Sequence, residues 1–289
     1  MKIPVTTGYL PFGKYRTFYR ISGFKTNQAP LLLLHGGPGS THQYFEHLDE
    51  LAVKSQRQLI MYDQLGCGRS SRPDQHPDLY QAATWVAELI NLRQKLGLAQ
   101  VHLLGQSWGG MLAIMYLCDH APTGIKSVIL SSTLSNADLW QKELHRLLKF
   151  MPQNEQQIIR QAEEQQDFTS EAYLRANQHF MELHCQSATK TATNFGQQAY
   201  LTAWGPNEYH PSGNLRNYNY TAKLVELKLP VLIISGTDDL CTPLIAKTMF
   251  DQLPQARWEL FAGCRHLPFI ESPRKYQQLL SEWLQQHDF

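Results

Sequence analysis

One short stretch of the sequence contains the residue types that nucleophilic catalysis requires. An apolar run at residues 101–104 breaks into the turn sequence Gly-Gln-Ser-Trp-Gly at 105–109, and apolar residues resume at Met111. This order predicts a strand, a tight turn and a helix, with Ser107 at the apex of the turn. The two flanking glycines carry no side chain that would clash where the strand and the helix cross. We therefore expect Ser107 to be a nucleophile, and a chance turn in a loop is the weaker alternative.

A serine hydroxyl is a weak nucleophile at neutral pH, so Ser107 needs a base and a third group that orients the base. Asp238, Asp239 and His266 each follow a short apolar run that is typical of a buried strand. In open α/β sheets, functional residues gather beyond the carboxyl ends of the strands. The chain order Ser, Asp, His is that of the α/β hydrolases. His266 is therefore the expected base.

The identity of the orienting acid rests on spacing. Asp239 lies three residues after Gly236 and three before Thr242, as in the acid loop of these hydrolases. We favour Asp239, and Asp238 remains an alternative. A third alternative is that both aspartates only form a turn or cap the following helix.

Acyl transfer also needs backbone N–H groups that stabilise the oxyanion. In this arrangement one comes from the residue after the nucleophile, which is Trp108. The second is expected from the sequence His-Gly-Gly-Pro-Gly at residues 35–39, which follows another apolar run. Gly37 is the predicted donor, because consecutive glycines let the backbone approach a substrate closely. A phosphate-binding loop is excluded, since the Gly-Lys-Ser/Thr ending is missing.

The elements that position these residues alternate along the chain. Strands are predicted near 31–34, 58–63, 101–106, 125–130, 230–236 and 257–261, with helices between them, including one over 78–96. This alternation predicts an α/β fold with a doubly wound, mostly parallel sheet. Residues 133–222 lose the short apolar runs and become glutamine-rich and helix-prone, with apolar faces. We predict an α/β-hydrolase core from residues 1–132 and 223–289, with 133–222 as an inserted helical cap.

The composition and charge of the chain limit the classes of partner that it is expected to bind. The 289 residues are 43% hydrophobic, which allows a sizeable core, and 26 basic against 25 acidic residues give a net charge of +1. No long block of like charge suggests a nucleic-acid groove or a membrane surface, so a small molecule or short peptide is the expected partner. Five widely spaced cysteines without a Cys-x-x-Cys pair favour a reducing compartment, and we predict a cytoplasmic protein. The histidine spacings fit no zinc helix, and we expect no metal or cofactor.

Four segments together resemble the signatures of the proline iminopeptidases, serine aminopeptidases of the α/β-hydrolase fold. They are residues 35–39, 63–70, 105–110 and, in the predicted cap, 204–209 with the sequence Trp-Gly-Pro-Asn-Glu-Tyr. The resemblance implies Ser107, Asp239 and His266 as the catalytic triad and Gly37 and Trp108 as oxyanion donors. It also implies a role for Glu208, because a cap glutamate in these peptidases binds the free α-amino group of the substrate.

The sequence also departs from this family. Leu240 stands where relatives often carry a second glutamate, and Asn217 and Asn219 stand where aspartates are common. Each change removes negative charge near the expected entrance for the substrate amine. The leading hypothesis is release of an N-terminal residue, with proline as a candidate, from short peptides or amino-acid amides. An esterase or amidase acting on substrates without a free amine is the alternative, and a non-catalytic binding protein of the same fold is a weaker one.

Overall fold

Short apolar runs form an eight-stranded sheet in the computed structural model, which describes residues 3–73, 76–185 and 196–288. The strand order is β1-β2-β4-β3-β5-β6-β7-β8. The strands are β1 (Val5–Phe12), β2 (Tyr15–Ser22), β3 (Leu31–Leu34), β4 (Leu59–Asp63), β5 (Val101–Gln106), β6 (Ile125–Ser131), β7 (Val231–Gly236) and β8 (Ala256–Phe261). The pairs β1–β2 and β2–β4 are antiparallel, and the remaining pairs are parallel.

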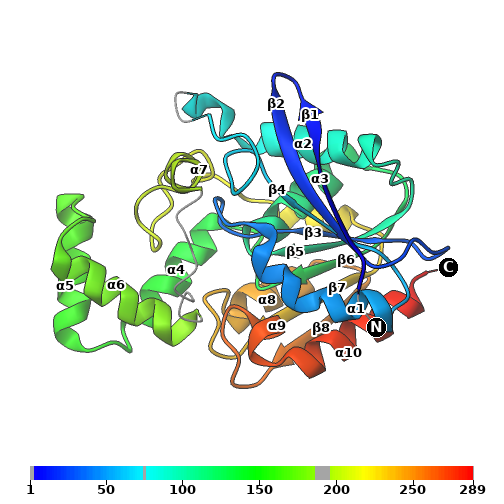
Figure 1. Ribbon diagram of the computed structural model, residues 1–289. Coiled ribbons are helices and arrows are strands. Elements are labelled where there is room, and N and C mark those ends of the chain that lie inside the picture. Colours follow the sequence, from blue (N-terminus) through cyan, green and yellow to red (C-terminus); the bar gives the residue numbers. More distant parts are fainter. Residues whose placement is uncertain (1–2, 74–75, 186–195, 289) are drawn as a thin grey trace.

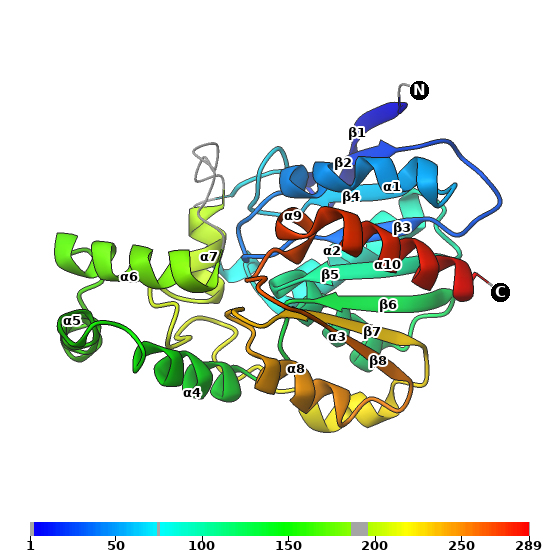
Figure 2. The same cartoon turned by 90° about the horizontal axis from the view of Figure 1, so that it is seen from below.

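Helices cover both faces of this sheet (Figure 2). One face packs against α1 (Asp49–Lys54), α9 (Pro268–Glu271) and α10 (Pro273–Gln286), and the other against α2 (Ala82–Lys95), α3 (Trp108–His120) and α8 (Pro243–Phe250). Alternate residues of a strand point to opposite faces, so Leu31 and Leu33 join one apolar cluster while Leu32 and Leu34 join the other. Burial on both faces explains why the central strands are continuously apolar. The predicted α/β-hydrolase fold class is confirmed.

A group of helices lies between β6 and β7 in the sequence, although these two strands are neighbours in the sheet. It contains α4 (Ala137–Leu148), α5 (Gln153–Gln165), α6 (Glu171–His184) and α7 (Gln197–Ala203), all within the predicted insertion at 133–222. Figure 1 shows α5 and α6 standing to one side of the sheet. A short 3-10 helix, η3 (Thr221–Glu226), crosses the predicted end of the insertion. The buried side chains Leu144, Ile159 and Phe180 give these helices, called the cap below, an apolar interior.

The helix predicted over 78–96 begins later than expected. A 3-10 turn, η2 (Pro77–Leu79), comes first, and α2 starts at Ala82 because the backbone of Gln81 is extended. The Tyr80 carbonyl lies outside the helix and accepts a hydrogen bond from Asn214 Nδ2 (2.9 Å). A contact with a segment more than a hundred residues away thus replaces the first helical turn.

A buried arginine joins distant parts of the core. Arg57 is fully buried, and its guanidinium donates to both carboxylate oxygens of Asp288 (2.9 and 2.8 Å) and to the Ala29 carbonyl (2.8 Å). The His102 ring lies 3.2 Å from the same carboxylate, and burial lowers the pKa of His102 to about 4. Because a buried charge needs a paired opposite charge, Asp288 is part of the core although it lies 231 positions after Arg57.

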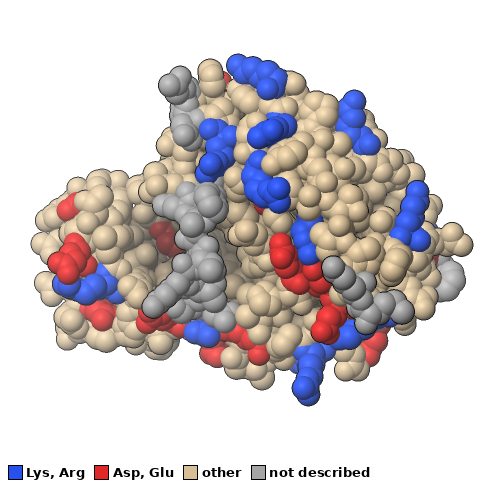
Figure 3. Space-filling view, viewed as in Figure 1, with Lys and Arg blue, Asp and Glu red and all other residues tan. Residues whose placement is uncertain are grey.

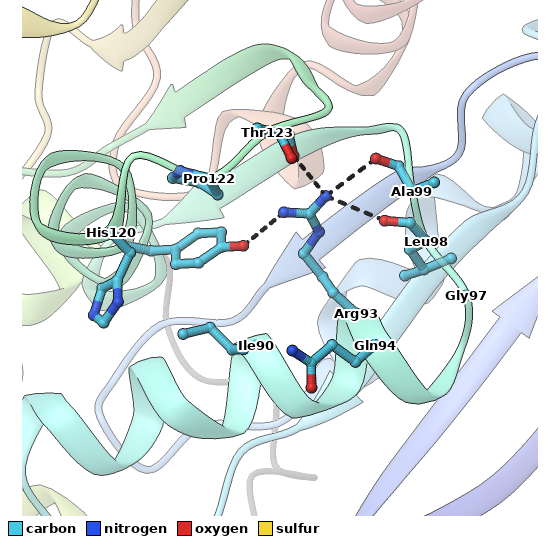
Figure 4. A pocket seen from close by; sticks show the side chains of 10 residues that line it. Ile90, Arg93, Gln94, Gly97, Leu98, Ala99, His120, Pro122 and Thr123 are labelled. Atoms are coloured by element: carbon cyan, nitrogen blue, oxygen red, sulfur yellow. Dashed lines mark hydrogen bonds between the residues drawn. The ribbon is translucent and has the colours of Figure 1, made fainter.

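A surface pocket lies at the amino ends of β5 and β6, away from the carboxyl ends where Ser107 is placed (Figure 4). Its wall contains Arg93, which donates to the Tyr116 hydroxyl (2.6 Å) and to the carbonyls of Leu98 and Thr123 (both 3.1 Å). Arg93 therefore ties α2 to the loops that enter β5 and β6.

Two properties of the surface and the helices bear on partners. On the face shown in Figure 3, basic side chains predominate in the upper part, and acidic and basic side chains are mixed in the lower part. Across the described segments, every helix is too short or too polar to cross a bilayer.

Candidate active site

Ser107 occupies the sharp turn between β5 and α3. Its φ of 54° and ψ of −122° are strained for a residue with a side chain, as expected for a nucleophile at such a turn. A Cβ atom at Gly109 would lie 1.9 Å from the Leu34 carbonyl oxygen, and one at Gly105 would lie 2.3 Å from the Gly109 oxygen. Only glycine fits at these two positions. The Ser107 side chain remains partly exposed.

The predicted base and acid meet at the carboxyl ends of β7 and β8. His266 Nδ1 lies 2.7 Å from Asp239 Oδ1. The Asp239 carboxylate is buried and also accepts the N–H groups of Cys241 (2.8 Å) and Gly236 (3.3 Å), whereas Asp238 is exposed. The structure therefore brings Asp239 rather than Asp238 to His266. A buried carboxylate at Nδ1 would hold the imidazole with Nε2 free to act as a base.

Ser107 and His266 are linked through the residue before the serine. Gln106 Nε2 donates to the His266 carbonyl at 3.4 Å. The Ser107 hydroxyl has no hydrogen bond to any residue that the structure describes. A serine–histidine contact often tightens only when substrate is bound.

The two predicted oxyanion donors flank the nucleophile. A Cβ atom at Gly36 would lie 3.1 Å from Ser107 Cβ, so the loop that carries Gly37 packs directly against the serine. Gly37 has a φ of 113°, a conformation that favours glycine. Within the described ranges, neither the Gly37 N–H nor the Trp108 N–H donates to a protein acceptor. Both groups are thus available to an oxyanion.

A buried amide connects the two donor segments, and sequence reasoning missed it. Gln64 Oε1 accepts the Trp108 indole N–H (2.7 Å), and Gln64 Nε2 donates to the His35 carbonyl (3.0 Å). The Gln64 backbone N–H donates to His35 Nε2 (3.0 Å), while His35 Nδ1 donates to the Gly36 carbonyl (2.9 Å). Burial lowers the pKa of His35 to about 4, so the ring is neutral and can accept at Nε2. His35 therefore attaches the glycine loop to Gln64.

Glu208 lies in the segment between α7 and η3, within the predicted insertion. The Tyr200 hydroxyl, from α7, donates to Glu208 Oε2, and the Trp140 indole N–H, from α4, donates to the Glu208 carbonyl (2.9 Å). Burial raises the pKa of Glu208, while the Tyr200 hydrogen bond and the charge of His266 act in the opposite direction. The Glu208 side chain is thus held by α7 and its backbone by α4.

Comparison with known proteins places the chain in a family. A family model for the alpha/beta hydrolase fold matches residues 29–273. The proline iminopeptidase of Lactobacillus delbrueckii subsp. lactis is 59% identical, over 98% of this chain and 99% of its own length. The chain belongs to the proline iminopeptidase family. Another relative, from Lactobacillus helveticus (strain DPC 4571), is 57% identical over the same shares of the two chains. The crystal structure of a proline iminopeptidase from Mycobacterium smegmatis superimposes with a TM-score of 0.89 at 29% identity, covering 98% of this chain and 99% of that one.

The residues that depart from the proline iminopeptidase pattern lie in different surroundings. Leu240 is buried next to Asp239, at the position where the sequence lacks a second carboxylate. Asn217 and Asn219 are exposed, and Asn219 forms an isolated β-bridge with Asn136 at the start of α4. Glu208 is not replaced in this way, and its carboxylate accepts a hydrogen bond from Tyr200.

Three side chains of this family member could together hold a metal ion. The ligand atoms of Asp239, Cys241 and His266 lie within 4.8 Å of one another. Burial raises the pKa of the Cys241 thiol well above its ordinary value, which disfavours the thiolate that a metal needs. One carboxylate oxygen of Asp239 is already shared between His266 and the Cys241 N–H. This arrangement suits a hydrogen-bonded acid and base.

Proposed function

We propose that this chain is a serine aminopeptidase that releases N-terminal proline from short peptides through an acyl-enzyme. The observation that carries the proposal is the buried Asp239–His266 pair beside the strained Ser107 turn, in a chain 59% identical to a proline iminopeptidase over nearly its full length. Small peptides are the substrates that this activity requires. Its location in the cytoplasm stays a prediction.

The reaction uses Ser107, His266 and Asp239 in sequence. Ser107 Oγ attacks the carbonyl carbon of the N-terminal residue while His266 Nε2 accepts the hydroxyl proton, and Asp239 stabilises the resulting imidazolium. His266 then gives this proton to the nitrogen of the leaving peptide, the C–N bond breaks, and an ester to Ser107 remains. Water, deprotonated by His266, hydrolyses that ester and restores the serine hydroxyl.

The negative oxygen of each tetrahedral intermediate is stabilised by the N–H groups of Gly37 and Trp108. Donors that are already oriented need no rearrangement when the charge develops, and each one contributes roughly 10²-fold or more to the rate. The absence of other acceptors for these two N–H groups in the described chain supports this role.

Recognition of the free α-amino group is assigned to Glu208. An ammonium group in a partly desolvated site pairs strongly with a carboxylate, and a blocked N-terminus would leave that carboxylate unpaired. With Leu240 in place of a second acid, Glu208 supplies the charge alone in this proposal, and Tyr200 holds one of its two oxygens. Among the described residues none donates a hydrogen bond to the other oxygen, Oε1, which leaves it available for the substrate amine.

The test is a panel of Pro-, Ala-, Leu- and Phe-arylamides with their N-blocked counterparts and an aryl ester. We expect the free Pro-arylamide to be hydrolysed fastest, the blocked arylamides slowly, and Ser107→Ala to remove turnover of all of them. Equal turnover of blocked and free arylamides would contradict the aminopeptidase and favour an esterase or amidase. If a fluorophosphonate fails to label the folded protein at Ser107, the chain is a binding protein rather than an enzyme.

A further inference from the structure

The residue before the nucleophile is a buried glutamine whose amide must be satisfied at both ends. Gln106 ends β5 and is only 2% exposed. A buried primary amide offers one acceptor oxygen and two donor hydrogens, and leaving them unpaired costs free energy. Its partners are the hydroxyl of Tyr44 and the carbonyl of His266.

The direction of each hydrogen bond follows from elementary valence. The Gly36 backbone N–H can only donate, and it donates to the Tyr44 hydroxyl oxygen at 2.5 Å. The single hydroxyl proton of Tyr44 then goes to Gln106 Oε1 at 2.9 Å. With the amide oxygen fixed in this way, Gln106 Nε2 points to the His266 carbonyl at 3.4 Å. One directed chain of hydrogen bonds therefore runs from the glycine loop to the loop of the catalytic base.

Packing holds Tyr44 in the middle of this chain. Tyr44 lies in the 3-10 helix η1 (His42–Leu48), and its ring stacks on Phe269 with centroids 5.5 Å apart and planes at 30°. Phe45 contacts the same ring edge-on at 4.5 Å. Phe269 belongs to α9, which begins two residues after His266. Tyr44 is thus attached to the base loop through its ring and to the glycine loop through its hydroxyl.

We propose that Tyr44 and Gln106 are positioning residues that set the separation of the oxyanion loop and the His266 loop on the two sides of Ser107. The inference rests on the proposed function, because it concerns the same acylation step. Its mechanism is geometric. The Gly36 N–H is committed to Tyr44 and is lost as an oxyanion donor, which leaves the next N–H, that of Gly37, for the substrate. Gln106 keeps the backbone of His266 beside the nucleophile.

The experiment compares Tyr44→Phe, Gln106→Leu and the double variant. Small misplacements of reacting groups reduce rates strongly, by up to about 10²-fold for roughly 1 Å. We expect kcat for Pro-arylamide to fall about tenfold in Tyr44→Phe and about 30-fold in Gln106→Leu, with KM within twofold of the unmodified enzyme. Because the two residues act in one chain, the double variant should be no slower than Gln106→Leu alone.

Matched controls separate positioning from general packing. Tyr62→Phe is the same substitution at a fully buried tyrosine whose hydroxyl has no partner in the described part of the chain. Gln277→Leu is the same substitution at a buried glutamine that bonds Lys54 and the His47 carbonyl. Both controls should keep kcat within twofold. Equal losses of kcat in Tyr62→Phe and Tyr44→Phe, or additive losses in the double variant, would overturn the proposal.

The rate of labelling by a fluorophosphonate gives a second readout at Ser107 that needs no substrate amine. It should slow in Tyr44→Phe and stay unchanged in Tyr62→Phe, with circular dichroism verifying the fold of each variant. If Gln106→Leu does not fold, the Tyr44→Phe comparison alone decides, and an unchanged labelling rate there refutes positioning. An enzyme that is labelled but does not hydrolyse Pro-arylamide would refute the proposed function while the labelling rates still test the positioning pair.

Discussion

The sheet side and the cap side of the site are held in place by different means. On the sheet side, Asp239, Gly37 and Trp108 lie at strand ends, and backbone N–H groups or buried side chains fix each segment. On the cap side, a carboxylate on a loop, Glu208, is oriented by one tyrosine from α7. If Glu208 binds the substrate amine as proposed, substitutions should be able to remove amine recognition without removing bond cleavage.

The largest effect is expected on the sheet side. Asp239→Asn removes the acceptor that orients His266, and kcat should fall by about 10⁴ for a free arylamide and a blocked ester alike. Asp238→Asn is the matched control, since Asp238 is exposed and its side chain makes no contact with His266 in the described structure. Steady-state kinetics of both variants test the pair. A larger loss in Asp238→Asn would reverse the assignment of the acid.

On the cap side, the loss should depend on the substrate. Glu208→Gln keeps the shape of the side chain but removes its charge, so kcat/KM for Pro-arylamide should fall by roughly 10²-fold, as for one partner of a desolvated charge pair. Turnover of the blocked ester should change by less than about twofold, within the scatter of surface substitutions. Glu164→Gln, the same substitution at an exposed position of the cap, should leave both substrates unaffected. Parallel losses for both substrates would place Glu208 in the chemistry instead.

The pH dependence of kcat/KM gives a second test of whether Glu208 acts only on substrates with a free amine. Burial raises the pKa of Glu208, so its charged form is lost at a higher pH than for an exposed glutamate. Only the charged form pairs with an ammonium group, and kcat/KM for Pro-arylamide should therefore decline as the pH falls through this raised pKa. Any decline that both substrates share belongs to the catalytic step, and the additional decline for Pro-arylamide should be absent for the blocked ester and for Glu208→Gln with either substrate. Profiles of kcat/KM recorded for the two substrates side by side measure it.

A smaller effect, on stability, is expected at the contact between α4 of the cap and the start of α8 beside the sheet. Glu143, in α4, accepts a hydrogen bond from the Thr242 hydroxyl at the start of α8 (2.6 Å). Its carboxylate also accepts hydrogen bonds from Nε and Nη2 of Arg146 (2.9 and 2.8 Å). Glu143→Ala should lower the free energy of unfolding by about 2 kcal/mol, the cost of losing hydrogen bonds to a charged group. Arg146 lowers the pKa of Glu143, so this contribution is present at neutral pH and lost as the pH falls through the lowered value. Urea unfolding of the unmodified protein and of Glu143→Ala at pH 7 and pH 4 measures this loss and its pH dependence. The same difference in unfolding free energy at both pH values would contradict the prediction.

The chemistry was predictable from sequence where the signal is local. The Ser107 turn and the continuous apolar strands each depend on fewer than ten consecutive residues, and the structure contains both. Spacing favoured Asp239 over Asp238, but the difference in burial that separates the two in the structure cannot be seen in adjacent residues of a sequence. Gln64 and Tyr44 could not be found this way, because their partners lie 44 and 62 positions away in the chain. Glu208 was predicted only from the resemblance of the chain to a family, since a lone glutamate in a loop carries no physical signal of its role.

The buried pair of Arg57 and Asp288 has a consequence for how the chain is made. Arg57 sits just before a central strand, and its charge stays uncompensated in the interior until a residue 231 positions later arrives. During synthesis this ion pair can form only after the residues that follow α10 have been made, long after β4 and the strands before it. The end of α10 must therefore dock before the Arg57 charge is buried together with its partner.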